Sequence, residues 1–314
     1  MKAIRIHAYG GPEVLLFEDA PRPRLAEGDV LVRVHAAGIN PVDWKIRQGY
    51  LRETIPYPLP FIPGWDLSGV VEEIGPGAAG FAAGFSVGDA VYARPDIARD
   101  GAYAECIAVR ASELARKPKT IGHVEAAGVP LAGITAWQAL FEVAGLSAGQ
   151  SVLIHAASGG VGSFAVQFAT WKGARVLATA SAANHELVRG LGADTVIDYR
   201  TTRFEEMARD VDVVFDTIGG ETQERSWGVL KPGGIQVSIV SPPSEETAKA
   251  RGVRAGYLFI GPNAPILSEI ARLIDEGRVR PIIGEVLPLS EARRAHELSQ
   301  TGHAKGKIVL TVAG

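Results

Sequence analysis

A glycine-rich turn between an apolar run and a helical pattern constrains the fold of this chain more than any other feature. The segment from Val152 to Ala169 reads VLIHAASGGVGSFAVQFA, with the turn at residues 157–162. Glycines in such a turn let the backbone approach a pyrophosphate, and free N–H groups at the helix start favour its negative charge. The segment therefore predicts a dinucleotide-binding loop formed by Ser158, Gly159, Gly160, Val161 and Gly162.

One position departs from the usual fingerprint, because Ala157 stands where its first glycine is expected. A methyl group is tolerated there if the residue needs no positive φ, so the mechanism survives the substitution. The alternative interpretation is a glycine-rich turn that binds no ligand.

The type of cofactor is predicted from the end of the next apolar run. A carboxylate there would hold the ribose 2′-OH of NAD and would repel a 2′-phosphate. Residues 178–185 contain no Asp or Glu, and the first carboxylate after the run is that of Glu186. Ser181 can donate a hydrogen bond to a 2′-phosphate, and His185, Tyr199 and Arg200 could contribute further hydrogen bonds or positive charge. NADPH is therefore favoured, although Tyr199 and Arg200 equally fit a solvated turn.

The order of apolar runs predicts two domains of different class. Runs at residues 3–7, 29–37, 67–74, 90–93 and 104–109, separated by Gly, Pro and Asp, favour a barrel-like antiparallel β domain. From Val124 helical patterns alternate with buried runs at 151–155, 175–179, 195–197, 212–215 and 235–240, which favours a doubly wound parallel sheet. Runs at 285–289 and 307–312 and a helix near 291–301 return to the first domain. We expect domains at 1–122 with 285–314, and at 123–284.

Composition excludes several classes of function. The 314 residues carry a formal net charge of −3, so no broad cationic surface is expected for nucleic acid or anionic membranes. No leader or membrane-spanning run is visible, which favours a cytoplasmic protein. Cys106 is the only cysteine, which excludes an intrachain disulfide and any zinc site built from several thiolates.

Six segments in order resemble the medium-chain dehydrogenase/reductase superfamily, in its quinone oxidoreductase (zeta-crystallin-like) branch. They are MKAIRIHAYGGPEVL at residues 1–15, AAGINPVDWKIRQG at 36–49, IPGWDLSGVVEEIG at 62–75, the glycine-rich turn, LGADTVIDYR at 191–200 and GHAKGKIVL at 302–310. The resemblance covers essentially the whole chain. It implies a GroES-like β-barrel domain, a Rossmann domain, an active site in the cleft between them, and a homodimer formed through a last strand at residues 256–260.

The resemblance also implies chemistry without zinc. The alcohol dehydrogenase branch holds a catalytic zinc with a Cys and a His, and the corresponding positions here are Asn40 and Trp65. Without a Lewis acid, oxidation of alcohols is disfavoured. Quinones and other conjugated carbonyl compounds remain as candidate hydride acceptors, because hydride addition converts them into a delocalised anion that hydrogen bonds can stabilise.

Individual site residues follow from the same resemblance. Asn40 is expected near the nicotinamide, bonded to the ribose or a substrate oxygen, although it also suits the turn before Pro41. Tyr50 is a candidate proton donor, although a packing role is more usual. Thr135 is expected beside the nicotinamide, unless it caps a helix. The remaining predicted cofactor contacts are Ile239, Ser241, Phe259, Ile260 and Lys305, with Lys307 also in the closing segment.

Two rival interpretations remain open. The same machinery could reduce a 2-enoyl thioester or an alkenal, although the loops at residues 46–60 and 241–257 carry no evident basic patch for a coenzyme A phosphate. The chain could also be a non-catalytic NADPH-binding protein with a structural or sensory role.

Overall fold

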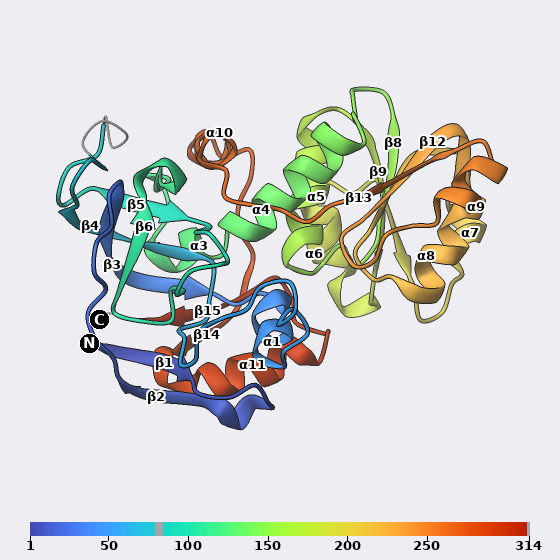
Figure 1. Ribbon diagram of the computed structural model, residues 1–314. Coiled ribbons are helices and arrows are strands. Elements are labelled where there is room, and N and C mark those ends of the chain that lie inside the picture. The colour runs from blue at the N-terminus through green and yellow to red at the C-terminus, as the bar shows by residue number, and fades with distance from the viewer. Residues whose placement is uncertain (79–83, 313–314) are drawn as a thin grey trace. The chain divides into compact units, whose positions relative to one another are not determined.

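The computed structural model describes residues 1–78 and 84–312, which form two compact units (Figure 1). Unit 1 comprises Met1–Leu131, Gly261–Gly277 and Pro281–Gly314. Unit 2 comprises Ala132–Ile260 and Arg278–Arg280. Every helix in the described residues is too short or too polar to span a bilayer.

Unit 2 is built on a six-stranded parallel sheet with the strand order β10-β9-β8-β11-β12-β13. This order, with the first strand of the sheet in the middle, is that of the doubly wound dinucleotide-binding fold. All residues of β11 are buried, as expected for a parallel strand covered on both faces. The strands are β8 (Ser151–Ile154), β9 (Arg175–Ala180), β10 (Thr195–Asp198), β11 (Val211–Asp216), β12 (Leu230–Ser238) and β13 (Arg254–Tyr257).

The helices of unit 2 connect these strands and flank the sheet (Figure 1). They are α4 (Pro130–Trp137, which begins in unit 1), the π-helical segment η3 (Gln138–Val143), α5 (Gly160–Trp171), η4 (Ala182–Asn184), α6 (His185–Gly190), α7 (Phe204–Met207), α8 (Gly220–Ser226), η5 (Trp227–Val229) and α9 (Glu245–Ala250). Strand β13 ends at Tyr257, so Phe259 and Ile260 follow the strand that was expected to contain them. Strand β13 lies at the edge of the sheet. Dimerisation through this strand stays a prediction.

Unit 1 contains a seven-stranded sheet with the order β14-β15-β3-β4-β5-β7, in which β6 pairs with β3. Its pairs are antiparallel except β14 with β15. Two more strands, β1 and β2, form a separate antiparallel ribbon. The bounds are β1 (Lys2–Ile6), β2 (Leu15–Asp19), β3 (Asp29–Gly38), β4 (Leu67–Ile74), β5 (Ala90–Ala93), β6 (Cys106–Arg110), β7 (Ala115–Arg116), β14 (Ile283–Pro288) and β15 (Lys307–Thr311). The barrel-like β domain is thus confirmed, while β2 and β7 are strands that the sequence pattern did not indicate.

Two helices group with unit 1 although the sequence pattern assigned their residues to the second domain. Helix α3 (His123–Ala127) packs on β3 and β4, and helix α10 (Ala264–Asp275) packs on β7. The sequence pattern could not detect this, because helix periodicity does not reveal which sheet a helix covers. The remaining helices of unit 1 are α1 (Pro41–Arg47), α11 (Ala292–Gln300), η1 (Pro12–Val14), η2 (Ala111–Glu113) and η6 (Leu289–Glu291).

One edge of the seven-stranded sheet collects polar residues from four neighbouring strands. Val309 of β15 pairs with Gly38 of β3, and Leu67 of β4 pairs with both Ala37 and Ala93. In this register the end of β3, the starts of β4 and β15 and the end of β5 lie at the same edge. The residues there are Lys307, Asn40, Asp66 and Arg94.

Candidate active site

A buried hydrogen-bonded network occupies this edge of the sheet in unit 1. The Lys307 ammonium donates to Asn40 Oδ1 (2.5 Å) and to Asp66 Oδ2 (3.1 Å), and Asn40 Nδ2 donates to the same Asp66 oxygen (2.9 Å). The other carboxylate oxygen of Asp66 accepts the backbone N–H of Leu131 at 2.7 Å. Asp66 is 0% exposed and Lys307 is 4% exposed, so this ion pair is shielded from water. We call these three side chains the edge network.

The start of α1 explains how Asn40 comes to serve the edge network. Asn40 precedes the helix, Pro41 supplies the fixed φ that suits its first residue, and Asp43 Oδ2 accepts the Asn40 backbone N–H at 2.8 Å. Because Asp43 satisfies the backbone, the Asn40 side chain turns to Asp66 and Lys307. Tyr103 donates its hydroxyl to the same Asp43 oxygen at 2.6 Å.

Burial dominates the electrostatics of the two carboxyl groups. It raises the pKa of Asp66, while Lys307 acts in the opposite direction. Burial also raises the pKa of Asp43 to about 7, against the hydrogen bonds from Tyr103 and from the Asn40 backbone. Since Asp66 and Lys307 fix which end of the Asn40 amide accepts, one Nδ2 hydrogen is left for another acceptor.

The other predicted residues of unit 1 lie apart from the edge network. Tyr50 follows α1, is 68% exposed, and packs edge-on against Trp44 with ring centroids 6.3 Å apart. Among the described residues Tyr50 makes no hydrogen bond to the edge network. Lys305 is exposed, whereas Lys307, two residues later, is buried within the network. A catalytic Tyr50 and a cofactor-binding Lys305 stay predictions.

In unit 2 the glycine-rich turn joins β8 to α5 as its sequence predicts. Gly159 precedes the helix, and no described side chain caps the N–H groups of its first turn. A Cβ atom added to Gly162 would lie 2.3 Å from the carbonyl oxygen of Ala156, so only glycine permits this close approach. The strained residue of the turn is Ala156, with a φ of 48°, whereas Ala157 needs no positive φ.

Three side chains converge at the ends of β8 and β9. Asn184 Nδ2 lies 3.1 Å from Ser158 Oγ and 3.3 Å from Ser181 Oγ, so it joins the glycine turn to the end of β9. His185 Nε2 is buried and has no hydrogen-bond partner among the described residues. Tyr199 and Arg200 are exposed just after β10, with the guanidinium 5.7 Å from the ring centroid.

The remaining predicted residues of unit 2 differ in environment. Ser241 is anchored, because its carbonyl oxygen accepts from Gln223 at 2.9 Å. Ile239 is half-buried and its N–H donates to Asp216 O (3.2 Å). Phe259 is 59% exposed, whereas Ile260 is 9% exposed. Thr135 is buried inside α4, so it does not cap the start of a helix.

The turn and the β9 end fit a nicotinamide dinucleotide. An uncapped helix start can hold a pyrophosphate, and the close packing at Gly162 brings the helix up to the strand. Ser158 in the glycine-rich turn and Ser181 after β9 carry hydroxyl donors, and His185 Nε2 has no partner among the described residues. These residues would hold the phosphates of the cofactor.

A zinc ion does not fit the residues at the two positions that hold it in the alcohol dehydrogenase branch. Asn40 Oδ1, the amide atom that could bind a metal, accepts from the Lys307 ammonium, and the Trp65 indole N–H donates to Arg99 O at 3.3 Å. Within residues 1–78 and 84–312 no three His, Cys, Asp or Glu side chains gather where they could share a metal ion.

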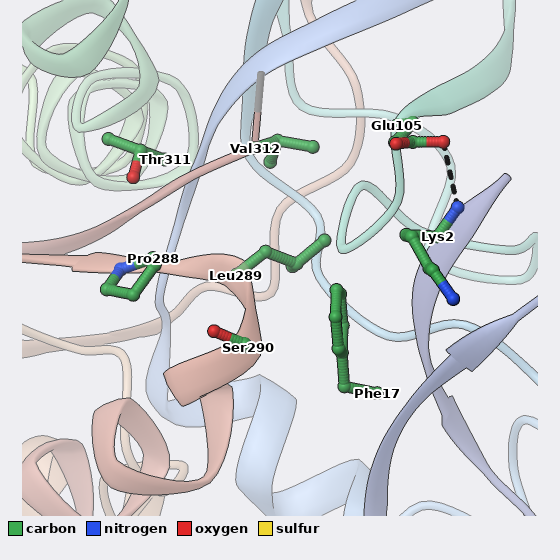
Figure 2. A pocket seen from close by; sticks show the side chains of 8 residues that line it. All are labelled: Lys2, Phe17, Glu105, Pro288, Leu289, Ser290, Thr311 and Val312. Atoms are coloured by element: carbon green, nitrogen blue, oxygen red, sulfur yellow. Dashed lines mark hydrogen bonds between the residues drawn. The ribbon is translucent and has the colours of Figure 1, made fainter. Parts of the chain in front are cut away.

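Unit 1 also has a hollow outside the edge network. Figure 2 shows this cavity of about 530 Å³, lined among others by Lys2, Phe17, Glu105 and Leu289. The polar groups there already have partners, because the Lys2 ammonium bonds Asp19 and Glu105 accepts the Lys2 backbone N–H at 2.8 Å. Among the described residues that line this cavity, no buried side-chain nitrogen or oxygen lacks a hydrogen-bond partner.

Sequence reasoning missed the partners that hold the site together. No local pattern singles out Asp66, and the closing segment does not distinguish Lys307 from Lys305. A lysine at the start of an otherwise apolar strand, as in KIVL at residues 307–310, is the signal for a buried cation. Asn184 carried no such signal, because Asn is common in turns.

Comparison with known proteins agrees with this architecture. The alcohol dehydrogenase GroES-like domain family matches residues 26–141, and the zinc-binding dehydrogenase family matches residues 191–310. The chain is 38% identical to an NADPH-dependent alkenal/one oxidoreductase of Arabidopsis thaliana, over 99% of this chain and 79% of that protein. It is 33% identical to a chloroplast envelope quinone oxidoreductase homolog of the same plant, over 99% and 98%.

A solved structure gives the same result for the whole chain. The quinone oxidoreductase from Coxiella burnetii superposes with a TM-score of 0.93 at 36% identity, covering 100% of this chain and 99% of that one. The chain therefore belongs to the medium-chain dehydrogenase/reductase superfamily, in its quinone oxidoreductase-like branch.

Proposed function

We propose that this protein is a zinc-independent reductase that uses NADPH to deliver a hydride to a quinone or another α,β-unsaturated carbonyl compound. The observation that carries the proposal is the edge network, in which an amide held by an ammonium–carboxylate pair stands at the zinc-ligand position. Such a site offers hydrogen bonds instead of a Lewis acid, which suits an acceptor whose anion is delocalised.

The end of β9 supports NADPH as the reductant. Ser158 and Ser181 present hydroxyl groups held by Asn184, and residues 178–185 contain no carboxylate that would repel a 2′-phosphate. The name of the Arabidopsis alkenal/one reductase agrees with this choice. When bound, the reduced nicotinamide supplies the hydride.

The residues of the chain then have separate roles. The free Nδ2 hydrogen of Asn40 donates to an oxygen of the acceptor or of the cofactor ribose. Lys307 and Asp66 hold that amide in one orientation, and their burial keeps water from competing for it. Asp43 and Tyr103 position the start of α1, and no proton transfer is assigned to them.

A second candidate keeps this machinery and changes the acceptor to an alkenal or a 2-enoyl thioester. The similarity to an alkenal/one oxidoreductase favours the alkenal form. A non-catalytic NADPH-binding protein is the candidate of another class, because a glycine turn alone supports binding and not turnover.

The test is to follow the oxidation of NADPH and, separately, of NADH by purified, metal-depleted protein. Quinones, enones, alkenals and enoyl thioesters are offered as acceptors. Turnover that prefers NADPH and depends on one acceptor class is the expected result. Tight NADPH binding without turnover of any acceptor would replace the proposal with the binding-protein candidate.

A further inference from the structure

Arg94 is a buried cation that no carboxylate binds directly in the described part of the chain. It is 2% exposed, and its guanidinium makes one hydrogen bond there, from Nη1 to the carbonyl oxygen of Pro95 at 3.1 Å. Its Nε–H is buried and has no partner. Burial lowers the pKa of Arg94, yet an arginine keeps its charge in proteins. A buried charge with so few hydrogen bonds destabilises the folded protein, so a functional role for Arg94 would explain its presence.

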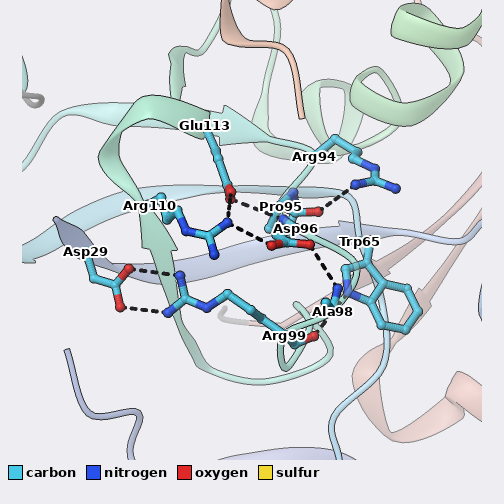
Figure 3. Close-up of polar contacts among 9 residues, drawn as sticks. All are labelled: Asp29, Trp65, Arg94, Pro95, Asp96, Ala98, Arg99, Arg110 and Glu113. Carbon is cyan, nitrogen blue, oxygen red and sulfur yellow. Dashed lines mark hydrogen bonds and ion pairs between the residues drawn. The ribbon is translucent and has the colours of Figure 1, made fainter. Parts of the chain in front are cut away.

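The three carboxylates drawn in Figure 3 bind arginines other than Arg94. Asp96 and Glu113 bind the Arg110 guanidinium at 2.7 and 2.9 Å. Asp29 forms a two-pronged pair with Arg99, at 2.6 and 2.9 Å. Figure 3 shows Arg94 turned away from these pairs, beyond Pro95. Two of these carboxylates share one arginine, Arg110, and act on the Arg94 charge only from a longer distance, because no hydrogen bond joins them to Arg94 among the described residues.

The sheet register places Arg94 beside the edge network. Leu67 pairs with Ala93, so the preceding Asp66 and the following Arg94 lie across from each other at the ends of β4 and β5. Asp66 attracts the Arg94 charge electrostatically, but its oxygens are already bound by Lys307, Asn40 and the Leu131 N–H. The Arg94 guanidinium therefore lies beside the edge network, and among the described residues no carboxylate binds it directly.

We propose that the Arg94 guanidinium binds the carbonyl oxygen of the acceptor and stabilises the negative charge that this oxygen gains during reduction. The proposal rests on the proposed function, and it adds the group that replaces the missing Lewis acid. A planar guanidinium with free N–H donors suits an enolate or phenolate oxygen, because such hydrogen bonds to charged oxygen are the strong ones.

The electron balance of the step defines this role. A hydride, with its electron pair, leaves the reduced nicotinamide and forms a C–H bond at the β-carbon of the enone. The π pair of the C=C bond shifts, so that the carbonyl oxygen becomes an enolate oxygen facing Arg94. A proton from water then adds to the α-carbon, the carbonyl re-forms, and the cofactor is left oxidised. Arg94 remains protonated throughout.

The test compares Arg94→Met and Arg94→Lys with Arg209→Met, which removes an exposed arginine from unit 2. We expect Arg94→Met to lower kcat/KM for an enone about 100- to 1,000-fold, which is the usual effect of removing one hydrogen-bond donor from an oxyanion hole. The Kd of NADPH should not change. Arg94→Lys should retain part of the activity. The melting temperature of Arg94→Met should be unchanged or higher, because the variant removes a buried charge that no carboxylate binds directly.

An equilibrium measurement makes the test independent of turnover. A nitrophenol is titrated in complex with protein and NADP⁺, and its ionisation is followed by absorbance. The expected result is a lower pKa for the bound nitrophenol in the wild type and in Arg209→Met than in Arg94→Met. Equal pKa values, or a lower melting temperature of Arg94→Met with kcat/KM unchanged, would overturn the assignment. If the wild type reduces no acceptor, the proposed function fails by itself and the nitrophenol titration alone decides the role of Arg94.

Discussion

Replacing Lys307 by methionine tests the electrostatics of the edge network. The substitution keeps the length of the side chain and removes the ammonium from Asn40 Oδ1 and Asp66 Oδ2. Asp66 would keep the bonds from Asn40 Nδ2 and the Leu131 N–H, but it would be a buried carboxylate without a cation.

The magnitude follows from this burial. With Asp66 0% exposed and Lys307 4% exposed, removal of one partner should cost about 3–5 kcal/mol of unfolding free energy at pH 8. Burial already raises the pKa of Asp66 in the folded protein, and loss of Lys307 raises it further. An acid whose folded pKa exceeds its unfolded value stabilises the fold most below the unfolded pKa, and this stability falls as pH rises. The cost should therefore be larger at pH 8 than at pH 5.

The assay is urea unfolding of the wild type, Lys307→Met and the double variant Lys307→Met/Asp66→Asn at pH 5 and pH 8. Lys305→Met, two residues away and exposed, is the matched control and should change stability little. The double variant should recover part of the loss at pH 8, because no charge is left buried. Equal losses at both pH values, without recovery by Asp66→Asn, would refute the electrostatic reasoning.

Two further substitutions test unit 2. Gly162→Ala places a Cβ 2.3 Å from the Ala156 carbonyl oxygen, so thermal unfolding should show that the free energy of unfolding falls by about 1–3 kcal/mol. The control is Gly190→Ala, where a Cβ would have no atom within 4 Å, and its free energy of unfolding should rise by up to about 1 kcal/mol. Asn184→Ala frees the hydroxyls of Ser158 and Ser181, and calorimetry should show the Kd of NADPH raised about tenfold with that of NADH unchanged. An equal change for both cofactors would remove the 2′-phosphate role of this cluster.

Local patterns predicted the class of both domains, although they did not indicate β2 and β7 or the unit to which α3 and α10 belong. Residues 67–74 and 90–93 form strands β4 and β5 with the predicted bounds, because each apolar run ends at a glycine, proline, charged residue or turn. The glycine turn was recognisable for the same reason, since the order of strand, turn and helix lies within one short segment.

The candidate site could be predicted only in part. Lys307 meets Asn40 across 267 positions of sequence, a pairing that depends on β15 returning beside β3. Local pattern also could not show that Ala156, and not Ala157, takes the positive φ of the turn. Arg94 follows a buried strand like many solvated arginines. Only the tertiary structure shows that it is buried and that no carboxylate among the described residues binds it directly.

Hydride transfer to a conjugated carbonyl is the central claim, and isotope labelling tests it most directly. The protein is incubated with an enone and NADPH that carries deuterium at C4 on the transferred face, and the product is analysed by mass spectrometry and NMR. The account predicts a saturated ketone with one deuterium at the β-carbon. A reduced ketone without deuterium from either C4 face, or an allylic alcohol labelled at the carbonyl carbon, would contradict it.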